Sequence, residues 1–112
     1  MSKSNLLKII EEVRKFDDQM EAQAIAVFFY VGVHGYENGV LMQQIQKDLS
    51  LAQSSVSRNV YKLADFNRHK KKAVGLLNTF DDPMERRRKK VILTSKGKRV
   101  FNSLVDLVNK WK

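Results

Sequence analysis

The sequence predicts a mainly α-helical domain that carries one small β-hairpin. Apolar residues recur at helical spacing over most of the chain. Two short strand-like segments flank a turn that holds the only proline, and another helical pattern follows them. The 112 residues suit one domain, 1–112, built around one hydrophobic core.

The composition excludes several classes of protein. The chain has no cysteine, which rules out disulfides, thiolate nucleophiles and cysteine-based zinc sites. No apolar run approaches the roughly 20 residues that a membrane helix requires. The first residues do not resemble a signal peptide, because Glu11 and Glu12 directly follow a short apolar pair. We therefore expect a cytoplasmic protein with no membrane contact.

Two helices are expected in the N-terminal third. The first spans residues 4–17 and carries an apolar stripe of period near 3.6. Asp18 followed by Glu21 resembles a capping box, which predicts a second helix over about 19–34. That helix is apolar almost all round, so we expect it to be the central buried helix.

The middle of the chain predicts a helix-turn-helix over about residues 41–66. Residues 34–39 hold two glycines and an asparagine and should form a turn or lead into a short strand. A helix of about two turns follows, with Leu41, Ile45 and Leu49 on one side. After a turn at 50–53, the next helix runs to about Phe66. Its inward stripe consists of Val56, Val60 and Leu63.

The C-terminal part predicts a hairpin and a last helix. Residues 74–80 and 88–94 have strand character, so the hairpin occupies about 73–94. Thr94 or Ser95 should cap a helix over 95–111, whereas the charge run 67–72 suits a loop. This order of elements predicts a winged helix-turn-helix. Its two terminal helices would pack on the domain or form a dimer interface.

The positive charge is concentrated in the second half of the chain. Residues 1–50 hold 5 Lys/Arg and 7 Asp/Glu, a net charge of −2, whereas residues 51–112 hold 16 and 5, a net charge of +11. The two values recover the total of +9. One basic half beside a near-neutral half predicts that one face meets a polyanion.

The second helix of the motif has the residue types of a helix that lies in a DNA groove. Gln and Asn can pair with adenine and Arg with guanine, while Ser hydroxyls suit phosphate oxygens. No acidic residue occurs in this segment before Asp65. Tyr61 could reach a phosphate or be a partly buried aromatic. We predict that the DNA-contacting residues here are Gln53, Ser54, Ser55, Ser57, Arg58, Asn59 and Lys62.

The hairpin adds a second cationic segment. Five consecutive cations run from Arg86 to Lys90, and alternation along a strand would make both faces of the tip basic. Arginine gains from the negative potential of a narrow minor groove. Asp82 and Glu85 are expected to fix the turn and orient an arginine. The predicted contacts are Arg86, Arg87, Arg88 and Lys89, together with Lys70 and Lys71 of the charge run.

These segments resemble the MarR family of winged helix-turn-helix regulators over about residues 38–104. The family's wing tip of D-x-R type and its L-T-x-x-G strand end fall on Glu85-Arg86-Arg87 and on Leu93 to Gly97. The resemblance implies that Arg87 or Arg86 enters the minor groove and that Ser54, Ser55, Ser57 and Arg58 face the major groove. The sequence departs from the family by Glu85 in place of Asp, a longer link before the wing and a shorter C-terminal helix.

The terminal helices suggest a homodimer. Both are amphipathic, and a two-fold dimer would place two recognition helices about 34–36 Å apart, one turn of DNA. The alternative is that both helices simply cover their own core. The predicted interface residues are Leu6, Ile9, Ile10, Val13, Leu104, Val108 and Trp111. The family's terminal helices normally also line an effector pocket, so a small-molecule effector stays an open alternative.

No catalytic, metal or cofactor site can be assembled from the sequence. His34 and His69 are the only histidines, and the Asp17-Asp18 and Asp81-Asp82 pairs suit caps and turns. We therefore expect no enzyme and no cofactor, but a sequence-specific double-stranded DNA-binding transcriptional regulator, and specifically a repressor. Two alternatives remain: a winged-helix module that docks on polymerase or a replication or partition complex, and a non-specific nucleic-acid binder.

Overall fold

The structure, a computed structural model, describes residues 2–17, 19–64 and 74–110. Five helices and three strands follow one another in this part of the chain. They are α1 (Ser2–Arg14), α2 (Ala22–His34), β1 (Val40–Leu41), α3 (Met42–Leu49), α4 (Gln53–Lys62), β2 (Leu77–Asp81), β3 (Lys89–Leu93) and α5 (Ser95–Asn109).

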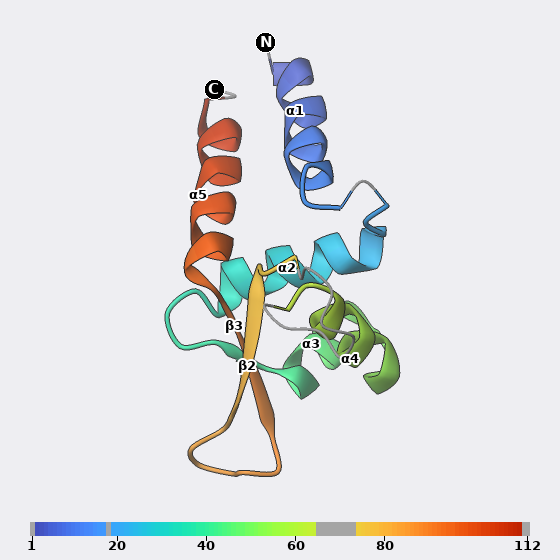
Figure 1. The fold of residues 1–112 in the computed structure, drawn as a ribbon, viewed down its shortest axis with the longest axis vertical. Coiled ribbons are helices and arrows are strands. Elements are labelled where there is room, and N and C mark those ends of the chain that lie inside the picture. The colour runs from blue at the N-terminus through green and yellow to red at the C-terminus, as the bar shows by residue number, and fades with distance from the viewer. Residues whose placement is uncertain (1, 18, 65–73, 111–112) are drawn as a thin grey trace.

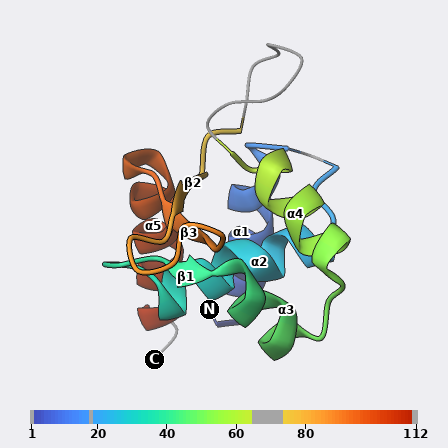
Figure 2. The same ribbon diagram turned by 90° about the horizontal axis from the view of Figure 1, so that it is seen from below.

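The elements divide between the two ends of an elongated molecule of 46 × 29 × 26 Å. Helices α1 and α5 lie side by side at one end, with both termini, and α2 crosses beneath them (Figure 1). Helices α3 and α4 and the β2–β3 hairpin occupy the other end (Figures 1 and 2). The side-chain amide of Asn5 donates to the carbonyl oxygen of Leu107 at 3.0 Å and so ties α1 to α5. None of the helices in the described part of the chain is long and apolar enough to span a bilayer.

Helix α2 is the centre of the core, as its all-round apolar sequence predicts. Val27, Phe28 and Val31 are fully or almost fully buried, and α2 packs against both α4 and β3. The helix begins at Ala22 rather than near residue 19. Glu21 is its N-cap, with extended backbone and no capping hydrogen bond from its side chain, so the predicted capping box does not start this helix. Asp18 lies outside the described residues.

Helices α3 and α4 form the two helices of the predicted helix-turn-helix. Ser50 adopts the left-handed conformation, with φ 54° and ψ 45°, and ends α3 before the chain enters α4. The predicted inward stripe of α4 is confirmed, because Val56, Val60 and Leu63 are completely buried. Helix α4 ends at Lys62, four residues earlier than predicted.

The sheet has three antiparallel strands in the order β1-β3-β2. The two hairpin strands pair from Leu77 with Leu93 to Asp81 with Lys89. The third strand, β1, pairs only Val40 and Leu41 with β3. The sequence predicts no strand here, only that residues 34–39 form a turn or lead into a short strand. Strand β2 begins three residues later than predicted. Just before it, the amides of Leu76 and Leu77 both donate to the Leu63 carbonyl at the end of α4.

A set of hydrogen bonds joins the hairpin to α5. Thr94 is the predicted N-cap of α5, and its hydroxyl accepts from the Gly97 amide at 2.9 Å. The same hydroxyl donates to the Gly75 carbonyl at 2.6 Å, and the Thr94 amide donates to the Leu76 carbonyl at 3.0 Å. Gly97 lies so close to the chain that a Cβ there would stand 2.1 Å from the Leu76 carbonyl oxygen. We call Gly75, Leu76, Thr94 and Gly97 the wing base.

Candidate nucleic-acid interface

Helix α4 presents a polar surface that contains no acidic residue. Its apolar stripe anchors the helix in the core, which leaves the opposite side of the helix facing solvent. Ser55 and Ser57 are half-buried at the margin of this surface. Tyr61 is 48% exposed, so it lies on the flank of the helix rather than in the core. We call the exposed residues the groove face: Gln53, Ser54, Arg58, Tyr61 and Lys62.

Asn59 is a correction to the predicted set of outward residues. Its side chain is buried, with 1% of its surface exposed, and its amide donates to the Gln23 side-chain oxygen at 3.2 Å. The bond joins α4 to α2, which fixes the rotation of α4 about its own axis. The prediction of a base contact by Asn59 was wrong because a partner distant in sequence satisfies this polar group inside the domain.

Two successive turns build the tip of the hairpin, residues 82–88, which we call the wing tip. The Glu85 amide donates to the Asp82 carbonyl at 3.2 Å, and the Arg88 amide donates to the Glu85 carbonyl at 2.9 Å. The buried Asp82 carboxylate accepts from the Met84 amide at 3.0 Å, and the Glu85 carboxylate accepts from the Arg87 amide at 3.3 Å. Both acids therefore fix the turn, as predicted, through backbone amides rather than through arginine side chains.

The wing-tip arginines occupy the turn and not a strand. Arg86, Arg87 and Arg88 precede β3, so the alternation expected of a strand does not apply to them. All three are exposed, and within the described part of the chain none forms an ion pair. A guanidinium without an internal partner keeps its donors free for an external anion.

The two lysines that do belong to β3 have partners on β2. Lys89 forms an ion pair with Asp81 at 2.5 Å, and Lys90 lies 5.9 Å from the centre of the Phe80 ring. The hydrogen bond and the charge of Asp81 raise the pKa of Lys89 above its ordinary value. Lys89 therefore carries a full charge at neutral pH, although that charge is partly compensated within the hairpin.

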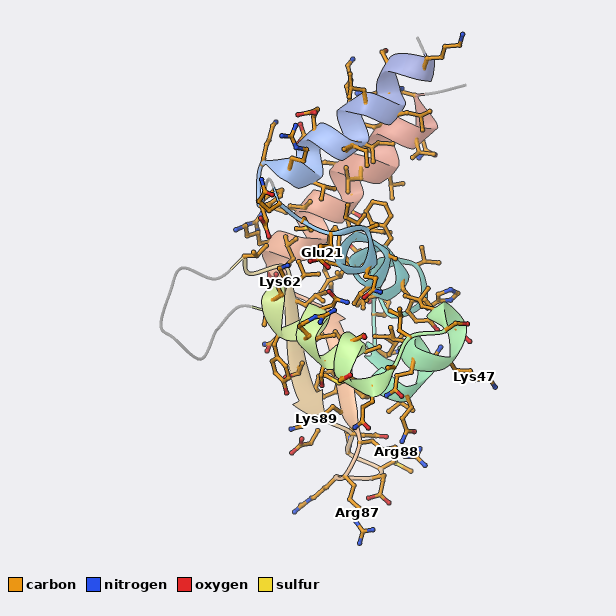
Figure 3. The ribbon with its side chains drawn as sticks, turned by 90° about the vertical axis from the view of Figure 1, so that its right-hand side faces the viewer. Glu21, Lys47, Lys62, Arg87, Arg88 and Lys89 are labelled. Atoms are coloured by element: carbon orange, nitrogen blue, oxygen red, sulfur yellow. The ribbon has the colours of Figure 1, made fainter. Side chains whose placement is uncertain are left out.

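The groove face and the wing tip lie at the same end of the molecule. Figure 3 shows Lys62 on α4 and Lys47 on α3 above the projecting hairpin, which carries Arg87, Arg88 and Lys89. Lys47 is exposed and was not predicted, because a lone lysine on an amphipathic helix gives no signal in the sequence. Lys70 and Lys71 of the predicted set lie outside the described residues.

A buried hydroxyl fixes α3 against α2. Tyr30 of α2 donates to the carboxylate of Asp48 at 2.5 Å, and burial together with this bond raises the pKa of Tyr30. The His34 ring contacts the Tyr30 ring in a tilted arrangement, with 4.5 Å between the ring centres and 42° between their planes. The groove face therefore rests on a rigid frame, because α2 holds α3 through Tyr30 and α4 through Gln23.

The opposite end of the molecule exposes apolar side chains. Of the predicted interface residues, Leu6, Ile10 and Val108 are exposed by 44 to 54%, and Ile9 is half-buried. Val13 and Leu104 are buried in the chain's own core and cannot belong to an exposed interface, and Trp111 lies outside the described residues. Leu7, Val33 and Val105 are exposed as well, and the sequence did not single them out. A shallow apolar hollow beside them is lined by Ile9, Phe29, Val33, Phe101, Leu104, Val105 and Val108.

Within the described residues, no group of three or more His, Asp or Glu side chains is placed to hold a metal ion. The arrangement at the hairpin end instead combines hydrogen-bonding groups on a helix with free cations on a protruding turn. Such a surface suits a polyanion with a groove beside a charged backbone.

Solved structures with the same architecture come from bacteria and an archaeon. MepR of Staphylococcus aureus, crystallised as a DNA complex, superposes with a TM-score of 0.69 and 21% identity, over 96% of this chain and 76% of MepR. A MarR transcriptional regulator from Methanosarcina mazei gives 0.68 and 17%, over 97% and 69%. The PcaV transcriptional regulator of Streptomyces coelicolor, in complex with its natural ligand, gives 0.60 and 24%, over 83% and 58%.

These likenesses confirm the predicted fold class. The chain has the winged-helix fold of MarR-type proteins, with five helices and a small antiparallel sheet in its described part. It spans 58% of PcaV and a larger share of MepR. No protein-family profile matches the sequence, and no curated protein matches it.

Proposed function

We propose that this protein is a sequence-specific double-stranded DNA-binding transcriptional regulator. One observation carries the proposal: the acid-free groove face of α4 and the exposed arginines of the wing tip lie at the same end of a winged-helix fold. A helix fits the major groove of B-DNA, and a cationic turn beside it can reach the neighbouring minor groove. MepR, which has the same fold, was crystallised as a DNA complex.

The residues divide between base contacts and backbone contacts. Arg58 and Gln53 have the bidentate groups that distinguish guanine and adenine in the major groove. Ser54, at the start of α4, has a hydroxyl and nearby free amides that suit a phosphate. Ser55, Ser57 and Lys62 border this contact. The wing tip supplies Arg86, Arg87 and Arg88, of which Arg87 or Arg86 enters the minor groove.

We propose further that the protein acts as a homodimer and a repressor. The exposed apolar side chains of α1, α2 and α5 supply a self-complementary surface at the end that is distant from the groove face. Two groove faces about one DNA turn apart would then read a palindromic site. A site that overlaps a promoter would block polymerase. A regulator of this kind would act in the cytoplasm and would need no cofactor, while a small-molecule effector stays an open alternative.

The test is fluorescence anisotropy with a duplex taken from upstream of the protein's own gene and a scrambled duplex, each at two salt concentrations. A specific regulator binds the upstream duplex more tightly and loses affinity steeply as salt rises. Arg58→Ala should weaken binding and relax the base preference. Arg99→Ala is the matched control, because it removes an exposed arginine from α5, away from the groove face.

Each other outcome points to an alternative function. Equal and salt-sensitive binding to both duplexes would indicate a non-specific nucleic-acid binder. The absence of binding at low salt would contradict the proposal and favour a winged-helix module that docks on another protein. If Arg58→Ala and Arg87→Ala both leave the affinity unchanged, the assignment of the interface is wrong.

A further inference from the structure

The most exposed apolar side chain of the described residues stands on the wing tip. Met84 is 91% exposed, whereas the other large exposed apolar side chains range from 37 to 66%. Most of those lie on α1, α2 and α5, at the opposite end of the molecule. An isolated apolar residue on a surface is ordinary. Met84 differs because it belongs to the protruding tip of a hairpin that also carries the exposed Arg86, Arg87 and Arg88.

The turn holds Met84 in a fixed place. Pro83 and Met84 are the two central residues of the turn that the Glu85 amide closes on the Asp82 carbonyl. No residue of this turn has a positive φ, so the turn is unstrained. The buried Asp82 carboxylate accepts a hydrogen bond from the Met84 amide at 3.0 Å, which fixes the backbone of the turn. Met84 is therefore displayed by a rigid support and would lose little backbone entropy on binding.

The charges around Met84 are arranged for an anionic partner. Asp81 is paired with Lys89, and the carboxylates of Asp82 and Glu85 accept backbone amides of the tip itself. Arg86, Arg87 and Arg88 are exposed and have no ion-pair partner in the described part of the chain. An apolar protein surface would leave these guanidinium groups desolvated and unpaired, which is costly. A DNA minor groove offers phosphates to the arginines and apolar sugar walls to the thioether.

We propose that Met84 is an apolar contact of the wing tip inside the minor groove, beside the arginine that enters it. Apolar side chains, methionine among them, lie against or between base steps in many minor-groove complexes. The flexible and polarisable Met side chain fits an irregular surface better than a branched one. This inference rests on the proposed DNA-binding function. It adds a contact that reads the shape and deformability of the duplex instead of its charge.

Oxidation footprinting tests the contact directly. Hydrogen peroxide transfers one oxygen atom to a thioether, which gives the sulfoxide and water. The chain has 4 methionines and no cysteine, and Met20 and Met42 are half-buried and serve as internal references. The folded protein is oxidised alone, with the upstream duplex, and with heparin, a polyanion that has no groove. Peptide mass spectrometry then gives the oxidation rate at each methionine.

We expect the duplex to slow the oxidation of Met84 by about fivefold or more, and heparin to slow it much less. Unchanged oxidation of Met84 in the DNA complex would overturn the inference. So would equal protection by heparin, because contact with the phosphates alone would then explain the effect. Oxidised protein should also bind the duplex more weakly, because the sulfoxide is polar.

Substitutions separate this inference from the proposed function. Met84→Gln replaces the thioether by a polar group of similar length, and Met84→Leu keeps an apolar one. We expect Met84→Gln to weaken duplex binding by about five- to tenfold with an unchanged salt slope, and Met84→Leu to weaken it by less than about threefold. Arg87→Ala should instead lower the salt slope.

If the unmodified protein fails to bind duplex DNA, the proposed function fails and this inference fails with it. If the protein binds, Arg87→Ala weakens it, and Met84→Gln does not, only the inference about Met84 fails. Because the Met84 side chain is 91% exposed, thermal unfolding of all Met84 variants should match that of the unmodified protein.

Discussion

The wing base and the wing tip lie at the two ends of the β2–β3 hairpin and differ in what surrounds their side chains. At the wing base, Leu76 is buried, Gly97 packs against its carbonyl, and Thr94 makes hydrogen bonds in three directions. At the wing tip, the side chains of Met84 and Arg87 are exposed, and both acids, Asp82 and Glu85, accept backbone amides of the turn. The base contributes stability, whereas the tip carries free cations and an apolar side chain.

The comparison predicts which property a mutation will change, the stability of the fold or the affinity for DNA. Changes at the base should lower the free energy of unfolding. They should weaken DNA binding only because less of the protein is folded. Changes at the tip should alter DNA affinity and leave the free energy of unfolding unchanged, because surface residues without partners contribute little to it. Four substitutions test this division, and we give them in order of decreasing expected effect.

Gly97→Ala should have the largest effect, a loss of stability. The new Cβ would meet the Leu76 carbonyl oxygen at 2.1 Å, so either α5 or the backbone at Leu76, directly before β2, must shift. We expect a loss of about 3 kcal/mol in the free energy of unfolding, measured by urea denaturation. Ser95→Ala, an exposed change two residues earlier in the same helix, is the control and should be nearly neutral. A stable Gly97→Ala protein would mean that the base is not closely packed.

Arg87→Ala should give the largest effect at the tip. We expect duplex affinity to fall about tenfold, and the slope of log K against log salt to shrink by about 0.9 for the lost phosphate contact. Its urea midpoint should equal that of the unmodified protein. Arg99→Ala removes the same charge from α5 and should leave both the affinity and the slope nearly unchanged. Similar losses in the two variants would show that only the net charge matters.

Thr94→Ala should have a moderate effect at the base. It removes the cap of α5 and leaves the Gly97 amide and the Gly75 carbonyl without their partner. We expect the free energy of unfolding to fall by about 1–2 kcal/mol, measured by the same denaturation experiment. Thr94→Ser keeps the hydroxyl and should recover most of this loss. If serine and alanine behave alike, the hydroxyl is not what stabilises the junction.

Asp81→Asn, at the end of β2 directly before the wing tip, should have the smallest effect. The carboxylate raises the pKa of Lys89 above its ordinary value of 10.5, so the pair stabilises the fold below that pH and loses its effect as the pH rises through the raised pKa. Both side chains are about half exposed, so the melting temperature at pH 7 should not change measurably. NMR titration of the Lys89 side chain should show its pKa falling toward 10.5 in the variant. An unchanged pKa would show that the pair does not form in solution.

The sequence predicted the parts of this fold that local patterns determine. Helical spacing located all five helices, and the N-cap at Thr94 follows from the residue type. The strand β1 was not predicted as such, because two residues become a strand only through pairing with β3. The start of β2 was misplaced, because the preceding residues bond to the end of α4 rather than to β3.

The candidate site shows the same limit. Serines, Arg58 and the wing arginines were located by residue type and spacing, and most of them are exposed as expected. Asn59 was misassigned because its partner, Gln23, lies on another helix. Val13 and Leu104 were assigned to an exposed interface because an amphipathic stripe does not reveal how much of it the chain's own core covers. No sequence pattern indicates that Met84 is exposed, because its exposure follows from the geometry of the turn.

The short strand β1 has a consequence for the order in which the protein folds and opens. Val40 pairs with Val91, so about fifty residues must be closed into a loop before this pair can form. Only two residues of β1 form pairs that offset this entropy cost, so β1 should join the sheet after the hairpin has packed against α2. It should also be the first strand to detach. In hydrogen exchange, the amides of β1 should therefore lose protection before those of β2 and β3, at a free energy well below that of global unfolding.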